Sequence, residues 1–539
     1  MKKRFLFLGF LFLVMISFIG CGKELKPEDR FSDYIKSWQK QDFASMYDFT
    51  SQSTQQKIKK EEFINRYKKI YGENGIEINQ LSIKFQPPKE EVKPNDKGEV
   101  SLPYSVKMDT LAGPYEYSGQ AKLVKEKHGE QDNWFIVWDT SMILKELKDG
   151  DRVGARIIPA GRGQILDRNG VGLAVNDTAL SIGVIPERLG ENEAVKLKIA
   201  ELLGISLDQV NKELGAKWVK PNLFVPLKTV AKDQTTLISK LMELPGVSSQ
   251  EVPVRYYPYK EIAAHLIGYV GNISAEELGS LEEKGYSPSD LIGKSGFEKI
   301  LEEKLRGKNG GEIYIVDSKT NAKNVIIKKN PVDGENIQLT IDINLQKAIY
   351  DQFQKDSGTA VAIHPKTGEV LAMVNSPSFN PNDFVLGISS DQWKALNEDP
   401  KKPLLNRFAQ TYAPGSAFKP ITAAIALKSG IVQPAQTRDI NGLLWQKDQS
   451  WGNYYVKRVT DPKKPVNLRD ALVYSDNIYF AQTALEIGAD RFLIEAKNFG
   501  FSESLPFSYP VNRSKLVAKD NFQNEMQLAD TGYGQGRLQ

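Results

Sequence analysis

The sequence predicts a multidomain α+β protein, and three observations support this fold class. The chain has 539 residues, more than one compact core usually holds. Its composition, 40% hydrophobic and 26% charged, is ordinary for globular domains and argues against low complexity. Near the amino terminus, helical spacing of apolar residues gives way to strict alternation, the order of a small α+β domain. We therefore expect roughly two to four folded domains.

Charge and the rare residue types exclude several classes of function. The net charge is +4, from 71 basic and 67 acidic residues, and no long basic run indicates nucleic acid as a partner. The only cysteine is Cys21, and the histidines are His128, His265 and His364. This set excludes a disulfide framework, a Cys-based zinc site and a thiol protease, and we expect neither a metal nor a cofactor. The expected nucleophile is a hydroxyl.

The amino terminus predicts export. Lys2, Lys3 and Arg4 precede an apolar run over residues 5–19, which is shorter than the ~20 residues of a membrane-spanning helix. The run ends in Phe-Ile-Gly-Cys at 18–21, which resembles the lipobox of bacterial lipoproteins. We expect a signal peptide over residues 1–21 and a lipid anchor on Cys21, with an uncleaved amino-terminal anchor as the alternative. Both place the body of the protein at the outer face of the cytoplasmic membrane.

The first predicted domain covers residues 24–148. It opens with helical spacing of Phe31, Ile35 and Trp38, which predicts a helix. Apolar residues then alternate over 76–85, 102–108, 115–123 and 134–138, which predicts strands. We expect helices followed by a curved antiparallel sheet.

The second predicted domain covers residues 155–335. Its opening, Arg-Gly-Gln-Ile-Leu-Asp-Arg-Asn-Gly at 162–170, predicts a strand closed by an Asn-Gly turn. Gly-Lys-Ser-Gly-Phe-Glu at 293–298 leads into a helix that ends near Arg306. Glycines here set turns and charged side chains cap or pair across helices, so we interpret this domain as scaffold.

The third predicted domain, residues 339–539, contains the candidate chemistry. It starts with a helix and a hairpin, whose strands at 360–363 and 370–374 flank a Pro-Lys-Thr-Gly turn. Ser416 then precedes an Ala-rich apolar stretch over 421–427, which predicts that it lies in the first turn of a buried helix, with Lys419 on the same face. A lysine whose pKa is lowered by burial can take the serine proton, and the helix amino terminus favours a developing oxyanion.

A second polar group lies downstream. Tyr-Ser-Asp-Asn at 474–477 falls in a loop between two helical stretches. From there Ser475 can relay a proton between Lys419 and a leaving group, and Asn477 can orient Lys419 and the substrate amide. The alternative is that Ser475 and Asp476 only cap the following helix. Ser-x-x-Lys alone is a weak signal, because residues 37–40 match it too.

Ser-x-x-Lys followed by Ser-x-Asn is the order of motifs in penicillin-interacting enzymes, and the chain resembles a class B penicillin-binding protein over nearly its whole length. The resemblance implies a cystatin-like or nuclear-transport-factor-like amino-terminal domain similar to that of methicillin-resistance transpeptidases, a pedestal or dimerisation domain, and a serine β-lactamase-like transpeptidase domain. It implies a serine-type D-Ala-D-Ala transpeptidase or carboxypeptidase in which Ser416 is acylated, Lys419 is its base, and Ser475 and Asn477 form the second motif. The implied partners are peptidoglycan stem peptides, β-lactam antibiotics and cell-wall synthesis proteins.

The third motif of the family, Lys-Ser/Thr-Gly on a strand, is expected after Ser-x-Asn. Lys-Thr-Gly at 366–368 precedes Ser416 and is predicted to be a turn, as is Ser-Phe-Asn at 378–380. The chain ends after Gly-Tyr-Gly-Gln-Gly at 532–536, which resembles the stretch ahead of the last helices of the family. We expect the transpeptidase domain to be incomplete at its carboxyl end, with apolar faces uncovered and transpeptidation impaired.

Three other functions remain open. A D,D-carboxypeptidase or β-lactamase uses the same acyl-enzyme but transfers the acyl group to water. A catalytically dead scaffold for wall synthesis would keep the pedestal and bind partners. A β-lactam sensor requires a transmembrane relay, for which the sequence offers one short apolar segment.

Overall fold

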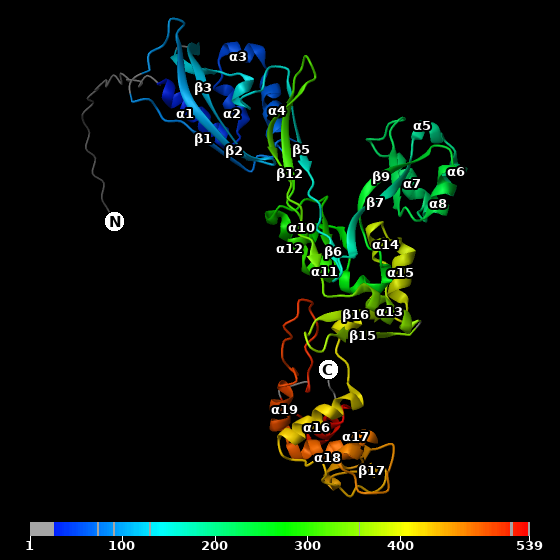
Figure 1. Cartoon of the computed structure of the whole chain (residues 1–539). Coiled ribbons are helices and arrows are strands. Elements are labelled where there is room, and N and C mark those ends of the chain that lie inside the picture. Colours follow the sequence, from blue (N-terminus) through cyan, green and yellow to red (C-terminus); the bar gives the residue numbers. More distant parts are fainter. Residues whose placement is uncertain are drawn as a thin grey trace, which may run out of the picture. The chain divides into compact units, whose positions relative to one another are not determined.

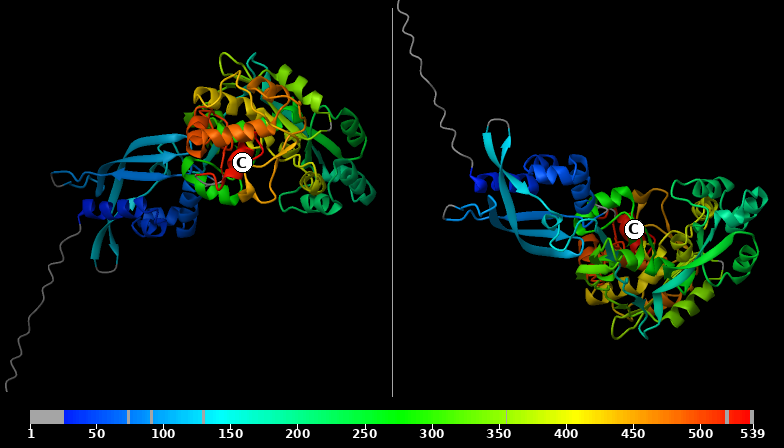
Figure 2. Two further views of the ribbon diagram at one scale, coloured as in Figure 1. Left: turned by 90° about the horizontal axis from the view of Figure 1, so that it is seen from below. Right: turned by 90° about the horizontal axis from the view of Figure 1, so that it is seen from above.

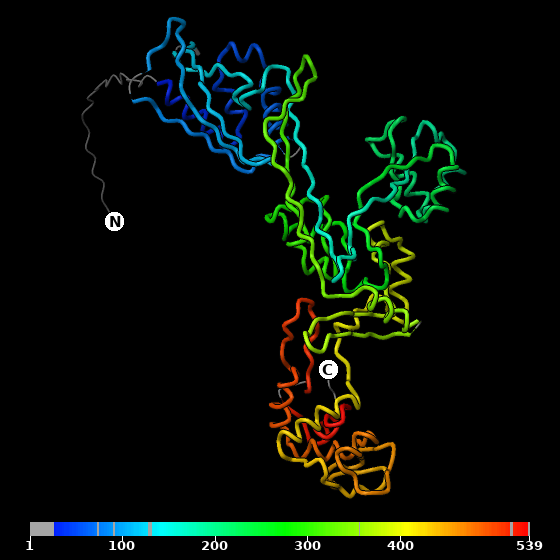
Figure 3. Tube along the Cα trace, viewed as in Figure 1, coloured from blue at the N-terminus to red at the C-terminus, as the bar shows by residue number. Residues whose placement is uncertain are grey.

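The computed structural model describes residues 26–72, 75–89, 92–128, 131–354, 356–517 and 521–536 (Figure 1). The predicted signal peptide and Cys21 lie outside the described residues. The chain forms two compact units, one made of residues 1–161 and 307–333, the other of residues 162–306 and 334–539. As the trace in Figure 3 shows, the chain leaves the first unit after residue 161, returns to it at residue 307 and leaves it again after residue 333.

In its described residues, the first unit contains four α-helices and a four-stranded antiparallel sheet of order β1-β2-β3-β4. β2 alternates buried and exposed residues along its length, which is why one face of the sheet packs on the helices. The predicted α+β domain is confirmed. The elements are α1 (Pro27–Gln39), α2 (Phe43–Asp48), α3 (Gln52–Lys57), α4 (Lys60–Tyr71), β1 (Gln80–Lys84), β2 (Glu99–Thr110), β3 (Gly113–His128) and β4 (Gln131–Val137).

One predicted strand segment is wrong. Ile76 and Ile78 were expected to begin the first strand, but they form the turn between α4 and β1. Their backbone N–H groups bond the carbonyls of Ile70 and Tyr71 at 2.7 and 3.1 Å, so they satisfy carbonyls at the end of α4. Ile76 is nevertheless fully buried, because the alternation that suggested a strand reflects packing of this turn on the core.

A second sheet belongs to the same unit. It has the order β13-β12-β5 and joins β5 (Arg152–Ile158) to the hairpin of β12 (Gly310–Val316) and β13 (Lys323–Lys329). Ile313 and Ile315 of β12 are buried in the same hydrophobic core as the amino-terminal helices. Strands distant in sequence therefore complete the packing of this unit.

The second unit begins with a mixed sheet of order β14-β6-β7-β8, in which β9 also pairs with β7. As predicted, residues 162–170 supply a strand and an Asn-Gly turn: β6 runs antiparallel to β7, and Gly170 between them has φ +81°. Helices α6, α7 and α8 pack on β8 and on the start of β9 around buried aliphatic residues. The elements are β6 (Ile165–Leu166), β7 (Gly172–Val184), α5 (Pro186–Leu189), α6 (Glu193–Leu203), α7 (Leu207–Leu214), β8 (Val225–Val230), α8 (Thr235–Met242), β9 (Val247–Tyr256) and β14 (Ile337–Gln338).

A buried ion network supports the residues predicted to be scaffold. Glu298, fully buried on α11, accepts from Arg162 Nε and Arg255 Nε at 2.7 Å each. Arg162 also pairs with Glu302 on α12 at 2.7 Å. The charged side chains therefore tie β9, the start of β6 and two helices together. The neighbouring elements are α9 (Ala264–Ile267), β10 (Val270–Asn272), α10 (Ala275–Leu281), β11 (Leu291–Gly293), α11 (Gly296–Ile300) and α12 (Glu302–Leu305).

The predicted hairpin is confirmed as β15 (Gly358–Ile363) and β16 (Val370–Ser376). Lys-Thr-Gly at 366–368 lies in the turn between these strands, as predicted, whereas Ser-Phe-Asn at 378–380, also predicted to be a turn, lies in coil ahead of α14. On β15, Val361 and Ile363 are 47% and 58% exposed and border an apolar hollow of about 500 Å³. The preceding helix is α13 (Ile343–Phe353), and α14 (Pro381–Val385) and α15 (Ser390–Glu398) follow.

The remaining helices enclose a separate apolar core around α18, whose residues Tyr479, Phe480 and Ala481 are fully buried. In both views of Figure 2 the red carboxyl-terminal segment lies against the orange helices, and α20 packs directly on α18. This core supports the segments that carry the candidate catalytic residues. The elements are α16 (Lys419–Lys428), β17 (Leu444–Trp445), β18 (Val456–Lys457), α17 (Leu468–Val473), α18 (Asn477–Ile487), α19 (Ala489–Lys497) and α20 (Glu525–Gly532).

Candidate active site

Ser416 lies in a single 3₁₀ turn, residues 415–418, that runs directly into α16. The predicted helical start is therefore confirmed, but its first turn is tighter than an α-helix. Pro420 has no N–H to donate to the Ser416 carbonyl, so the N–H of Lys419 bonds that carbonyl instead. This i to i+3 geometry places both side chains on one face: Ser416 is exposed, whereas Lys419 is only 2% exposed.

The ammonium nitrogen of Lys419 gathers the predicted residues into one cluster. Lys419 Nζ lies 3.0 Å from Ser416 Oγ, 2.8 Å from Ser475 Oγ and 2.6 Å from Asn477 Oδ1. It also contacts the Ser475 carbonyl oxygen at 2.7 Å. Ser475 Oγ completes the ring, since it lies 2.9 Å from Ser416 Oγ. Lys419 Nζ therefore contacts the other three residues predicted from sequence, and Ser475 also contacts Ser416, whereas Asn477 joins the cluster through Lys419 alone.

Burial lowers the pKa of Lys419 to about 8, and the Asp476 carboxylate opposes this shift. Removing an ammonium group from water disfavours its charged form, so the neutral amine becomes accessible near physiological pH. The hydrogen-bonding partners of Nζ are two hydroxyls, an amide oxygen and a carbonyl oxygen, none of which carries a full charge. The site is thus arranged around an amine that can accept a proton.

Ser475 is held in an uncommon backbone conformation. Its φ is +51°, in the left-handed region that costs a non-glycine residue about 1–2 kcal/mol. The conformation lets both the carbonyl and the hydroxyl of Ser475 reach Lys419 Nζ, because they approach the amine from one short loop. Strain at this position is consistent with a site that fixes its groups in advance.

Asp476 performs the helix-capping role that was the alternative for this loop. Its Oδ1 accepts from the backbone N–H groups of Ile478 and Tyr479, so it is the N-cap of α18. Ser475 does not share this role, since its hydroxyl bonds Ser416 and Lys419. The other carboxylate oxygen of Asp476 accepts from Arg458 Nη1 at 2.7 Å. Arg458 is a residue that sequence reasoning missed, because no motif marks a lone arginine.

The turn at residues 532–534 contacts the segment that carries Ser416. Gly415 N–H donates to the Gly534 carbonyl at 3.0 Å, and Thr422 Oγ1 donates to the Gly532 carbonyl at 2.8 Å. Gly534 has φ +81°, and a Cβ there would lie 1.9 Å from the Gly415 carbonyl oxygen. Asp530 on α20 accepts from the hydroxyls of Tyr454 and Tyr533, which fixes this turn. Only glycine fits where the turn meets the serine loop.

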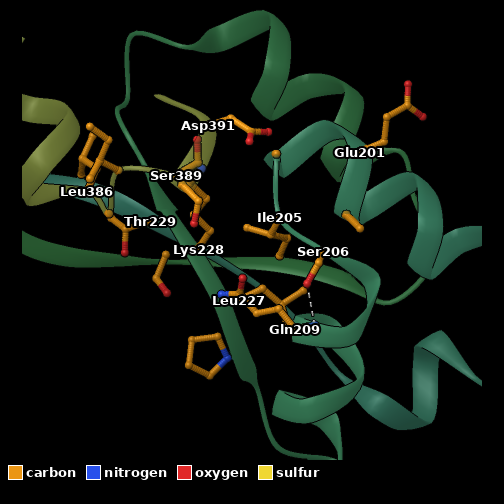
Figure 4. A pocket seen from close by; sticks show the side chains of 17 residues that line it. Glu201, Ile205, Ser206, Gln209, Leu227, Lys228, Thr229, Leu386, Ser389 and Asp391 are labelled. Carbon is orange, nitrogen blue, oxygen red and sulfur yellow. Dashed lines mark hydrogen bonds between the residues drawn. The ribbon is translucent and has the colours of Figure 1, made fainter. Parts of the chain in front are cut away.

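A different hollow, of about 950 Å³, lies in the same unit between the α6–α7 region, β8 and the α14–α15 connection. Figure 4 shows Ser206 and Gln209 at one wall and Ser389 and Asp391 at another. Its lining mixes acidic, basic and hydroxyl side chains but contains no hydroxyl paired with a buried amine. This hollow therefore lacks the paired hydroxyl and buried amine that make the Ser416 cluster the candidate active site.

Within the described residues, no group of three or more His, Cys, Asp or Glu side chains is placed to hold a metal ion. In the same part of the chain no helix is both long and apolar enough to cross a bilayer. His265 is buried against Phe379, with its Nδ1 3.1 Å from Ser378 Oγ, and takes no part in the Ser416 cluster.

Comparison with known protein families matches three domains along the chain. Residues 26–151 match an NTF2-like N-terminal transpeptidase domain, residues 157–339 a penicillin-binding protein dimerisation domain, and residues 358–539 a penicillin-binding protein transpeptidase domain. These matches correspond to the amino-terminal, pedestal and catalytic parts expected from the sequence.

Individual relatives agree. The chain is 44% identical over its whole length to penicillin-binding protein 3 of Bacillus subtilis, of which the match covers 80%. It is 33% identical over 67% of its length to the peptidoglycan D,D-transpeptidase MrdA of Acinetobacter baumannii and 32% identical over 64% to MrdA of Escherichia coli. The chain spans about half the length of these MrdA relatives, 54% and 55%.

Solved structures similar to this chain are also penicillin-binding proteins. A complex of penicillin-binding protein PBP2 with MreC from Helicobacter pylori superposes with TM-score 0.56 and 26% identity, covering 72% of this chain and 74% of that one. PBP2 of Helicobacter pylori alone superposes with TM-score 0.52 and 27% identity, over 71% of this chain and 74% of the other. With its three domains in family order and a serine–lysine cluster in the last of them, the chain belongs to the class B penicillin-binding proteins.

Proposed function

We propose that the protein is a peptidoglycan D,D-transpeptidase that forms an acyl-enzyme on Ser416. The observation that carries this proposal is the hydrogen-bonded ring of Ser416, Lys419 and Ser475, to which Asn477 is joined through Lys419 Nζ. The name of the MrdA relatives, peptidoglycan D,D-transpeptidase, supports the same reaction.

In the acylation step, Ser416 Oγ attacks the carbonyl carbon of the penultimate D-alanine of a stem peptide. The hydroxyl proton passes to Lys419 Nζ, 3.0 Å away, as the C–O bond forms. The bond to the terminal D-alanine then breaks, and its nitrogen takes a proton delivered from Lys419 through Ser475 Oγ. We assign the backbone N–H of Ser416 as one donor to the oxyanion, as the family resemblance implies. An acceptor amine on a second stem then takes the acyl group, and a β-lactam acylates the same serine.

The contacts of Lys419 show how its neutral form can act as the base. An ammonium group has three N–H donors, but Nζ has four oxygen neighbours within 3.0 Å. A neutral amine keeps two donors and one lone pair. Because Asn477 Oδ1 and the Ser475 carbonyl can only accept, the lone pair is left for the Ser416 hydroxyl. The hydroxyl is then oriented with its proton toward the base.

The rate of Ser416 acylation is expected to rise with pH along a limb centred near the Lys419 pKa of about 8. The rate rises with pH because Lys419 is protonated at pH values below its pKa, and a protonated amine cannot take the serine proton. At pH 7 a pKa near 8 leaves roughly 300-fold more neutral amine than the ordinary lysine pKa does. Stopped-flow acylation by a chromogenic β-lactam at several pH values measures the limb, and a flat profile over this range contradicts Lys419 as the base.

Labelling by a fluorescent penicillin tests the nucleophile. Any covalent label is expected on Ser416, and Ser416→Ala is expected to abolish it, because no other hydroxyl of the cluster occupies the same position at the start of α16. Ser37→Ala, which removes the serine of the second Ser-x-x-Lys match, is the matched control and should label fully. Label retained by the Ser416→Ala protein contradicts the proposal, and peptide mapping of the wild-type adduct identifies the site directly.

We also propose that the protein works at the outer face of the cytoplasmic membrane, held there by lipid on Cys21. The lipobox-like residues 18–21 support this location. A cell-wall synthesis protein is a proposed partner, since the structural relative from Helicobacter pylori was solved in complex with MreC. Stem peptides and β-lactams are the proposed substrate and inhibitor.

A further inference from the structure

Arg458, which follows β18, is the hub of a buried charged cluster behind the Ser-Asp-Asn loop. Its side chain is fully buried, and so is that of Asp476. The guanidinium donates to Asp476 Oδ2 at 2.7 Å, to Asp461 Oδ1 at 2.8 Å and to the carbonyl oxygens of Gly442 and Ile440 at 2.8 and 2.9 Å. A planar group with acceptors in four directions is fixed in position.

Asp476 connects this cluster to the nucleophile's base. It stands between Ser475 and Asn477, and both of these contact Lys419 Nζ. Its Oδ1 is used by the helix cap and its Oδ2 by Arg458, so the carboxylate is held from both sides. A change in the charge or position of Asp476 is therefore expected to alter both the conformation of the Ser475 loop and the environment of the Lys419 amine.

The charges in this region balance. Asp476 and Asp461 are paired with Arg458, and Asp461 is also paired with the exposed Lys463 at 2.8 Å. No carboxylate of the described residues forms an ion pair with Lys419. Asp476 nevertheless acts on the amine through its charge, and its negative charge favours the protonated form. The adjacent positive charge of Arg458 acts in the opposite direction.

We infer that Arg458 is a positioning residue for acylation, which fixes the Ser-Asp-Asn loop through Asp476 and offsets part of the effect of the Asp476 charge on Lys419, so that the lysine can act as a neutral base. This inference rests on the proposed acylation of Ser416, which it deepens. A purely structural arginine would hold the loop without changing how Lys419 titrates. The two roles are therefore separable by the pH dependence of the reaction.

The test measures the second-order rate of Ser416 acylation by a fluorescent penicillin against pH for a set of charge variants. Arg458→Gln is expected to move the rising limb to higher pH by about one unit, because Asp476 then acts on Lys419 unopposed. Asp476→Asn is expected to move it to lower pH by a similar amount, while asparagine keeps the helix cap. The double variant is expected to return close to the wild-type limb, and Arg458→Lys to retain most of it.

Lys428→Gln is the matched control, because it removes an exposed cation from α16, the helix that carries Lys419, and it should leave the limb in place. Thermal denaturation of each variant separates loss of folded protein from a shifted limb. Shifts of Arg458→Gln and Asp476→Asn in the same direction, or no shift in either, overturn the inference.

A second measurement tests the role of Arg458 without depending on acylation of Ser416. Trace acetylation of Lys419 against pH, quantified by peptide mass spectrometry, reports the titration of the amine without any β-lactam reaction. If the wild-type chain does not acylate, the proposed function fails, yet the opposite shifts of the two variants must still appear in this titration. Their absence there overturns the role of Arg458 by itself.

Discussion

Replacing Lys419 by methionine is expected to lower the rate of Ser416 acylation by about 10³ to 10⁴-fold, the upper part of what a positioned base contributes. Methionine has a similar length and suits the buried site, so the fold is expected to persist. Among the described residues, the variant removes the one group within hydrogen-bond distance of Ser416 Oγ that can act as its base, since Ser475 is itself a hydroxyl. The measurement is the second-order rate constant for a fluorescent penicillin at a pH above the Lys419 pKa.

Lys428→Met is the matched control for this change. Lys428 lies on the same helix, is 62% exposed and pairs with Glu495 at 2.6 Å, so its loss should leave acylation unchanged. Lys419→Arg sharpens the result, because a guanidinium keeps the charge but does not release a proton at any pH of the assay. Acylation of the Lys419→Met protein within tenfold of wild type contradicts the role of Lys419 as base.

The four site residues could be predicted because their geometry is local or lies at a helix start. Ser416 and Lys419 are three residues apart on one turn, and Ser475 and Asn477 flank the N-cap of α18. That the two pairs would meet came from the family resemblance, not from periodicity. The support behind them could not be predicted, because Arg458 reaches Asp476 across 18 residues of irregular chain with no repeating pattern.

The limits of the fold prediction have a similar cause. Periodicity identified the amino-terminal helices and strands and the β15–β16 hairpin, whose partners are neighbours in sequence. It could not identify the pairing of β5 with β12, because Arg156 and Glu312, register partners in that sheet, are 156 residues apart. It misassigned Ile76 and Ile78, because a buried turn and a strand both place alternate side chains inside.

Replacing Glu298 by glutamine is expected to destabilise the second unit by about 3–5 kcal/mol, the usual cost of removing one partner from a buried ion pair. Glu298 neutralises Arg255, which is 2% exposed by its side chain, and shares Arg162 with Glu302. Glutamine has the same size but no charge, so Arg255 loses its carboxylate partner and keeps only neutral amide oxygens, that of Asn176 and that of the substituted side chain, as acceptors among the described residues. The measurement is the free energy of unfolding in denaturant, followed by fluorescence.

Glu303→Gln provides the matched control, because Glu303 lies on the adjacent helix α12, is 86% exposed and forms only a 3.5 Å surface pair with Lys284. Its substitution should leave unfolding unchanged, since exposed pairs contribute little. Arg255→Met combined with Glu298→Gln should recover part of the loss, because it removes the guanidinium left without a carboxylate. If Glu298→Gln unfolds like Glu303→Gln, the network does not hold the pedestal strands to α11, and residues 162–170 need another explanation for their fixed position.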